Sequence, residues 1–437
     1  MNAASPIERI ATRGAPSPAG GAAWTRRRQR ALASLVAKGL PDRRDENWKY
    51  LDHARIATYA FEAAPGGETD AAALAARLLP LANARRVVLA DGRFAPVLSD
   101  FGTKPGLEIL DLAALLDRDP EASLALLRAP GDDPDDRYAL LADAFATGGV
   151  LLRVAAGCEI AEPIYLVHLA TAARPAVHQA RIVIEAGAGA RFTLVEHFMS
   201  QGDAAALGNL ASEVAIGEGA DVTHVRLHQH GAEAAQVETC VVRLAARSRY
   251  AQHLLALGGR ILRSSLRVAL EGEHAGCRLD GLFLADGERQ VDLVTQVAHR
   301  GAATETVQEY RGIAAGRGRG AFNGRIDVHA TAKGANASQS SRNLLLTPLA
   351  EINVRPQLEI QVDDVQCRHG ATIGSLDAEQ MFYLESRGID PATARALLTF
   401  AFCRDLTGRL PFAALRETAE ALVAGSLPDR DLIGGPG

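Results

Sequence analysis

The chain has 437 residues, of which 48% are hydrophobic, only 5% are aromatic and 41 are glycine. This length allows one large core with accessory domains, and a formal charge of −5 gives no reason to expect a nucleic-acid partner. The five cysteines are odd in number and widely spaced, which argues against a disulfide framework and indicates a reducing compartment.

The N-terminal third is expected to be mostly helical. Residues 1–23 are rich in Ala, Gly, Pro and Ser, and we expect them to be flexible. They contain no apolar leader, and no uncharged run in the chain approaches ~18 residues, so we expect a cytoplasmic protein without a membrane partner. A helical domain is predicted over 24–147, with helices over 24–38, 71–84, 112–127 and 136–147 and a strand over 86–89 before Asp91-Gly92.

The pattern changes at Gly149, where short β-branched runs begin to alternate with Gly/Ala corners. Gly157, Gly187 and Gly217 each follow an apolar run and are spaced 30 residues apart. A strand–corner–strand unit that recurs every 20–50 residues is typical of a solenoid, in which each coil buries its apolar face against the next. We therefore predict a β-solenoid core over 148–375. An ordinary β-sandwich with similarly spaced turns is the alternative.

A helical C-terminal domain is predicted over 376–437. Asp377-Ala-Glu-Gln380 resembles a capping box and opens a helix that closes at Gly388, while Asp390-Pro391 combines an N-cap with a first-turn proline. A third helix is expected over 411–424, ended by Gly425. The tail from Pro428 is expected to fray.

Several kinds of catalytic and nucleotide site have no motif in this sequence. The chain has no Gly-x4-Gly-Lys-Ser/Thr loop, no His-Glu-x-x-His and no Gly-x-Ser-x-Gly, so we expect no nucleotide site of its own. His224, His228 and His230 share one strand face, but the first two would lie about 13 Å apart, too far for one ion. We expect these histidines to lie on the surface or to pack between coils.

Cys367 and His369 form the strongest candidate site. They follow the alternating run Pro356–Val362 and are two residues apart, so on a strand they share one face at a spacing of about 6.6 Å. Thiolate and imidazole are suitable ligands for iron or zinc, so the pair is half of a metal site. A buried thiol beside a hydrogen-bonded core histidine is the alternative. Cys158, Cys240, Cys277 and Cys403 are expected to be small buried hydrophobes.

The C-terminal third closely resembles the SufD family, a scaffold subunit of the Suf iron–sulfur cluster assembly system. The resemblance rests on an N-terminal segment and on five C-terminal ones. Their residues are Asp45-Glu-x-Trp-Lys-Tyr50, Ser341-Arg-Asn-Leu-Leu-Leu346, Pro356-Gln-Leu-Glu-Ile360, Asp363-Asp-Val-x-Cys367-x-His-Gly-Ala-Thr372, Gly374 and Phe382-Tyr-Leu-x-Ser-Arg-Gly-Ile389. Arg368 departs from the small Ser that the family usually has between Cys and His, which adds charge and bulk beside the pair.

The resemblance implies a right-handed parallel β-helix between N- and C-terminal helical domains. It implies a non-enzymatic scaffold that joins a SufB-like paralogue and two copies of a SufC-like ABC ATPase. In that family the histidine of the motif belongs to the SufB–SufD interface, which assigns His369 to a transient iron–sulfur cluster shared with the partner, with Cys367 as an accessory ligand. The C-terminal helices would dock SufC through an apolar surface made of Leu397, Leu398, Phe400, Ala401 and Phe402.

Two other functions remain as alternatives. A standalone β-solenoid enzyme that acts on polysaccharide would need carboxylates that recur from coil to coil, and the sequence has no such set. A cupin-like metalloenzyme would need a further glutamate and a distant histidine in a set order. The sequence leaves open whether the isolated chain forms a homodimer and whether a flavin binds the assembled complex.

Overall fold

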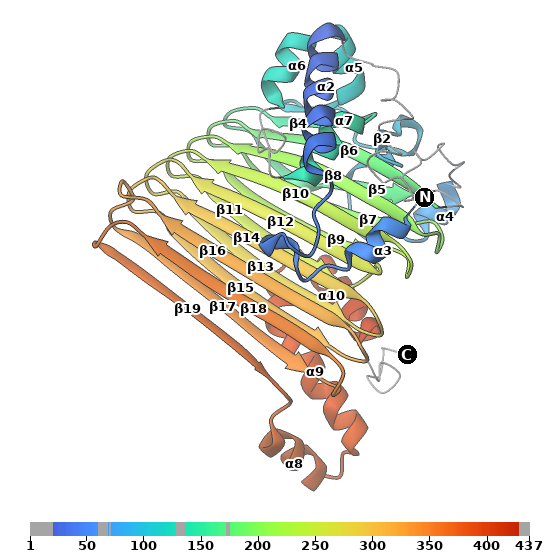
Figure 1. Ribbon diagram of the computed structural model, residues 1–437, viewed down its shortest axis with the longest axis vertical. Coiled ribbons are helices and arrows are strands. Elements are labelled where there is room, and N and C mark those ends of the chain that lie inside the picture. The colour runs from blue at the N-terminus through green and yellow to red at the C-terminus, as the bar shows by residue number, and fades with distance from the viewer. Residues whose placement is uncertain (1–20, 60–68, 70, 128–135, 172–174, 428–437) are drawn as a thin grey trace.

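The computed structural model describes residues 21–59, 69, 71–127, 136–171 and 175–427, and within them the chain is mainly β. Two parallel sheets face each other and form a solenoid, with helices near both ends (Figure 1). The expected flexible segment up to residue 20 and the expected frayed tail from Pro428 lie outside the described residues. No helix of the described part is long and apolar enough to cross a membrane.

The solenoid is built from strands that alternate between the two sheets. Each strand pairs in parallel with the strand one coil away, as in the Gln339↔His369 register of β17 and β19. A sandwich would pair chain neighbours antiparallel, so the predicted solenoid is confirmed. The strands are β4 Gly149–Val154, β5 Glu159–Ala170, β6 Ala176–Ala186, β7 Arg191–Ser200, β8 Ala206–Ile216, β9 Asp221–Gln229, β10 Ala235–Leu244, β11 Arg249–Ala256, β12 Ile261–Leu270, β13 Gly276–Ala285, β14 Gln290–His299, β15 Glu305–Ala314, β16 Arg319–Val328, β17 Ala335–Leu345, β18 Glu351–Ile360 and β19 Val365–Gly374.

One corner of every coil needs a residue in the left-handed backbone region. Each such residue donates its N–H to a carbonyl of the next coil, as Gly157 does to Ala188 at 2.8 Å. The ladder runs through Gly157, Gly189, Gly219, Arg247, His274, Ala303 and Gly334. The predicted spacing of 30 residues is thus correct only on average, because successive corners are 27 to 32 residues apart, and its phase is wrong, because the equivalents of Gly157 are Gly189 and Gly219. Gly187 is needed for another reason: a Cβ there would lie 2.4 Å from the backbone nitrogen of Ala156.

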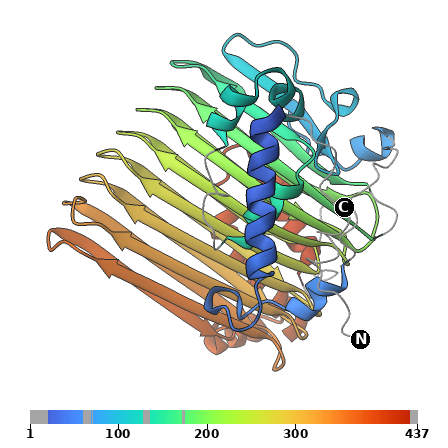
Figure 2. The same cartoon turned by 45° about the horizontal axis from the view of Figure 1, so that its top comes forward.

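Two helices of the N-terminal region cover the outer face of the nine-stranded sheet. The long helix α2 Gly21–Lys38 runs across the strands (Figure 2). Beneath it, α7 Arg137–Phe145 packs against β6, β8 and β10. Helix α2 begins three residues before the predicted start, and α7 confirms the predicted helix over 136–147. The 3-10 helix η1 Glu46–Trp48 and α3 His53–Thr58 lie between them in the chain.

Two predicted N-terminal helices are shorter than expected. The helix expected over 71–84 is only α4 Ala71–Ala75. The one expected over 112–127 is broken into α5 Leu112–Arg118 and α6 Pro120–Leu126, because a proline cannot continue the hydrogen-bond ladder. This region also supplies strands to the solenoid sheets, which are β1 Arg85–Ala90, β2 Arg93–Phe94 and β3 Leu107–Asp111.

The C-terminal helices follow the last strand. Helix α8 Ala378–Ser386 extends beyond the last coil, while α9 Pro391–Thr407 and α10 Ala413–Ser426 lie against the ten-stranded sheet (Figure 1). The predicted N-caps are confirmed, since Asp377 accepts from the N–H of Glu379 and Asp390 from that of Ala392. Helix α10 starts two residues later than predicted and passes through Gly425.

Candidate functional site

The solenoid ends in two strands that pair on one side only. Strand β19 is the last strand of the ten-stranded sheet, and β18 is the last strand of the nine-stranded sheet. Each is ten residues long, and within the described residues its outer edge carries no partner strand. A row of unpaired N–H and C=O groups is a template for another strand, so this end of the solenoid is open at both sheets.

Cys367 and His369 lie on β19 and face the space between the two sheets. Cys367 pairs in register with Ala337 and packs against an apolar cluster at the solenoid end that includes Ile326, Val328 and Ala332. His369 shares the strand face of Cys367 because it is two residues further on, yet its side chain is exposed. Both candidate ligands therefore line the open end, where another chain could reach them.

The electrostatic setting of Cys367 favours the protonated thiol. Burial raises the pKa of the Cys367 thiol, and a backbone hydrogen bond involving Ala337 opposes this only in part. A thiol with a raised pKa is a poor nucleophile at neutral pH, whereas a coordinated metal ion removes its proton outright. Cys367 is thus better suited to metal binding than to nucleophilic catalysis.

Arg368 does not disturb the pair. It lies between Cys367 and His369 in sequence, so its side chain belongs to the opposite, outer face of the strand, where it is exposed. The departure from the resembled motif therefore leaves the inward-facing pair intact.

Within the described residues, no group of three or more His, Cys, Asp or Glu side chains could hold a metal ion. As candidate ligands, Cys367 and His369 number two, and the described residues bring no third such group beside them. The arrangement fits a coordination sphere that a second chain completes. It does not by itself form a closed structural site, which would need four ligands.

The three histidines of β9 and its turn pack between coils, as predicted, and none lies on the surface. His228 stacks on Phe198 of the neighbouring coil, with ring centroids 4.3 Å apart, and also on His230. His224 contacts the carboxylate of Glu196 at 2.9 Å. Burial lowers the pKa values of His224 and His230.

A buried charge network inside the solenoid was not anticipated from the sequence. The Arg226 guanidinium donates to Glu196 at 2.7 Å and to both oxygens of Glu238 at 3.0 Å, and all three side chains are 1% exposed. Burial alone would raise the pKa of Glu196, but Arg226 and the histidines outweigh it and hold that pKa well below its usual value. Two sequence signals point to the network: its charged residues lie at inward strand positions, and Glu196 and Arg226 are one repeat apart, which puts them in register on neighbouring coils.

The remaining cysteines are structural. Cys240, Cys277 and Cys403 are buried, and burial raises the pKa values of Cys240 and Cys403 to about 12. Cys158 is only partly buried, at the edge of the main core. The prediction of buried small hydrophobes is confirmed for the first three.

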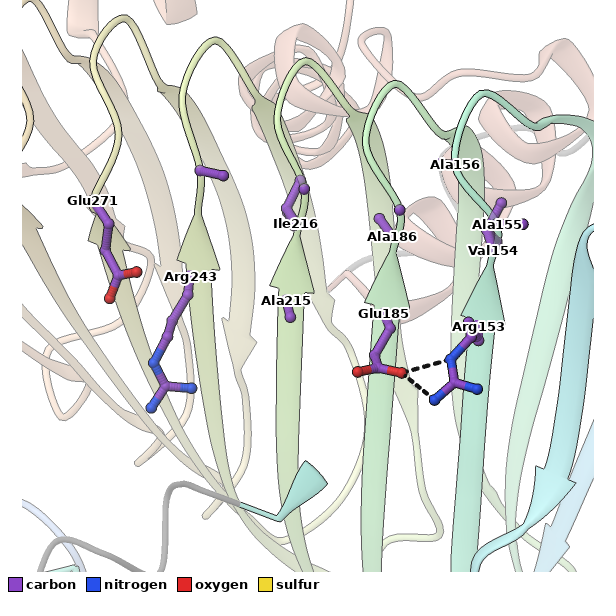
Figure 3. Close-up of a pocket in the computed structure, with 13 residues that line it drawn as sticks. Arg153, Val154, Ala155, Ala156, Glu185, Ala186, Ala215, Ile216, Arg243 and Glu271 are labelled. Atoms are coloured by element: carbon purple, nitrogen blue, oxygen red, sulfur yellow. Dashed lines mark hydrogen bonds and ion pairs between the residues drawn. The ribbon is translucent and has the colours of Figure 1, made fainter. Parts of the chain in front are cut away.

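A surface hollow of about 500 Å³ lies elsewhere, on the outer face of the nine-stranded sheet. In Figure 3 Arg153 contacts Glu185, while Ala215 leaves a gap before Arg243 and Glu271. Small residues at the coil corners create this space, and neither a histidine nor a cysteine lines it. It offers no ligands comparable with those of β19.

The apolar surface of the C-terminal helices differs from the predicted one. Phe400 and Phe402 are partly buried because they pack against the outer face of the ten-stranded sheet. The exposed apolar side chains lie mainly on α8, where Phe382 is 73% and Tyr383 is 57% exposed, next to Leu397 of α9 at 39%. The apolar surface that remains open is therefore centred on α8.

The sequence is similar to a known protein family and to several of its members. The family described as SUF system FeS cluster assembly, SufBD core domain, matches residues 168–402, which run from β5 to α9 and include β19. The iron–sulfur cluster assembly protein SufD of Escherichia coli is 30% identical, over 92% of this chain and 92% of that protein. A SufBD family iron–sulfur cluster assembly protein of Synechocystis is 29% identical, over 89% and 88%. SufD of Bacillus subtilis is 28% identical over 64% of each chain.

Proposed function

The chain belongs to the SufBD family of iron–sulfur cluster assembly proteins, and from this premise we propose that it is a scaffold subunit that holds a nascent cluster jointly with a SufB-like chain. One observation supports the proposal above all: Cys367 and His369 face inward on the last strand of the solenoid, which pairs with β17 on one side only. The proposal assigns the chain no catalytic step and places it in the cytoplasm.

Pairing would use the open end of the solenoid. A SufB-like chain whose own end strands lie beside β18 and β19 would extend both sheets and satisfy the edge N–H and C=O groups. It would also enclose the space that Cys367 and His369 line. Ligands from the second chain would then join a thiolate and an imidazole, both of which bind iron.

The cluster would be cargo that this site releases. Two protein ligands from one chain give weak binding, and the raised pKa of the Cys367 thiol means that metal must displace a proton. Both properties favour transient binding of the cluster at the interface between the two chains. Separation of the chains would remove the shared coordination.

A SufC-like ATPase would dock at the C-terminal helices. The apolar side chains of Phe382 and Tyr383 are exposed on α8, which extends beyond the last coil (Figure 1), and Leu397 is exposed on α9. Aromatic side chains that stay exposed at a protruding helix are typical of a binding surface rather than of a core. Force applied by the ATPase at α8 would act next to β19, the strand that carries His369.

Amide hydrogen exchange tests the pairing. The chain is expressed with the SufB-like and SufC-like proteins of its own genome, and exchange is compared between the complex and the isolated chain. We expect protection of β18 and β19 to rise in the complex. Strand β2, at the opposite edge of the ten-stranded sheet, is the internal control and should not change. Equal exchange at β19 in both samples would contradict pairing through this end.

A further inference from the structure

A column of polar side chains lies inside the solenoid beneath His369. Gln308 of β15, Gln339 of β17 and His369 of β19 occupy matched register positions in three successive coils. All three belong to the inward strand faces, and neighbouring strands are about 4.8 Å apart. Below Gln308 the matched residue is Leu279, so the column ends on an apolar floor.

The two glutamines are buried and partly hydrogen-bonded. Thr295 of the opposite sheet donates to the Gln308 Oε1 at 2.8 Å, and the Gln339 Nε2 donates to the same oxygen at 3.4 Å. Gln339 is 3% exposed and Gln308 is fully buried. Within the described residues the Gln339 Oε1 is buried without a hydrogen-bond partner. A buried acceptor that is left unpaired destabilises the fold, so its retention needs an explanation.

The opposite sheet makes room for this amide. A Cβ at Gly324 of β16 would lie 2.0 Å from the Gln339 Nε2, so only glycine leaves space for the glutamine in its present position. Gln308 contacts Gln339 from the coil below. The amide is therefore held in place from two directions, and its unpaired oxygen lies in the layer directly beneath His369.

We propose that Gln339 is a positioning residue for His369. Within the described residues no hydrogen bond joins the two side chains as they stand, and the exposed ring, once turned inward, donates one ring N–H to this amide oxygen. A neutral imidazole carries one N–H and one lone pair, so an acceptor beneath the ring fixes the N–H on the inner nitrogen. The outer nitrogen then presents its lone pair to the open end. A hydrogen-bond acceptor on the ring nitrogen that does not bind the metal commonly orients metal-binding histidines. The role of the oriented lone pair rests on the proposed function, whereas the hydrogen bond itself does not.

Nitrogen-15 NMR of the full chain with labelled histidine tests the proposal. The His369 signals are assigned from a His369→Ala sample, and the ring nitrogen shifts at pH 8 report the tautomer. We expect one dominant tautomer in the native chain. Gln339→Met keeps the side-chain length but removes the acceptor, and the tautomer ratio should fall about 5-fold toward that of a solvent-exposed histidine.

Two further variants control for indirect effects. Gln339→Glu retains an acceptor and should preserve the dominant tautomer, whereas Ser340→Ala on the other face of β17 should change nothing. A native His369 with the tautomer mixture of the exposed His274 would overturn the proposal, and this result needs no variant that folds. An unchanged ratio in Gln339→Met would also overturn it. A fixed tautomer combined with normal cluster content in His369→Ala would refute the proposed function but not the hydrogen bond.

Discussion

Replacement of Arg226 by Met should destabilise the solenoid by about 3–5 kcal/mol, because it leaves two buried carboxylates without their counter-charge. Arg226 makes three hydrogen bonds of 2.7–3.0 Å to Glu196 and Glu238. The size can be checked from Glu238, whose pKa falls from 4.5 to about 2 although its burial opposes the fall. That change corresponds to about 3 kcal/mol in favour of the folded state at neutral pH.

Urea unfolding followed by far-ultraviolet circular dichroism measures this cost. Arg153→Met is the matched control, since Arg153 makes a surface ion pair with Glu185 and the two side chains are 40% and 29% exposed; it should cost less than about 1 kcal/mol. If Arg226→Met lowers the free energy of unfolding by no more than Arg153→Met does, the buried network does not stabilise the fold as its geometry indicates.

The pH dependence of the same variant gives a second check. In the native chain the lowered pKa values of Glu196 and Glu238 contribute stability that is full above pH 4.5 and is lost as the pH falls through the folded values. Without Arg226, burial raises both pKa values, so protonation relieves the unpaired charges. The gap in unfolding free energy between native chain and variant should narrow from pH 7 to pH 4, and a constant gap would refute the reasoning.

Three further predictions follow from the fold. Phe382→Ser with Tyr383→Ser should abolish binding of the SufC-like ATPase at an unchanged melting temperature, because both side chains are exposed; unaltered copurification would contradict docking at α8. Ala303→Gly should stabilise the chain by about 0.5–1 kcal/mol by relieving a left-handed corner, whereas Ala302→Gly should not; equal urea midpoints would contradict this. Burial lowers the pKa of His197 to about 4, so its contribution to stability is full above pH 6.5 and is lost as the pH falls toward 4. His197→Gln should therefore make the unfolding free energy less dependent on pH between 6.5 and 4, and an unaltered slope would contradict this.

The sequence contains enough information for the fold because the solenoid repeats. A corner every thirty residues and an alternating pattern in each strand repeat the same local signal along the core. The phase error at Gly187 arose because two kinds of glycine look alike in sequence: Gly189 supplies a left-handed turn, while Gly187 only lacks a Cβ. Arg247, His274 and Ala303 occupy left-handed corners without being glycine, so composition gives no sign of them.

The part of the candidate site that lies on one strand could be predicted from the sequence. The part that different coils bring together could not. Cys367 and His369 share a strand, so their common face follows from their spacing. Gln339 lies thirty residues earlier in the chain and meets His369 only through the coil register. Arg226 and Glu196 are in register on neighbouring coils, so the repeat relates them, but Glu238 lies in the opposite sheet and no repeat spacing brings it to Arg226. Contacts between coils depend on the number of residues in each corner. That number cannot be predicted to within one residue from a single sequence.

The central claim is that His369 provides a ligand to a cluster shared across the open end of the solenoid. Iron and acid-labile sulfide in the anaerobically purified complex with the SufB-like and SufC-like chains test it most directly. His369→Ala should assemble the complex normally but lose most of its iron and sulfide, whereas His274→Asn, which removes an exposed imidazole at a distant corner, should keep both. Full iron and sulfide content in an intact His369→Ala complex would contradict the claim.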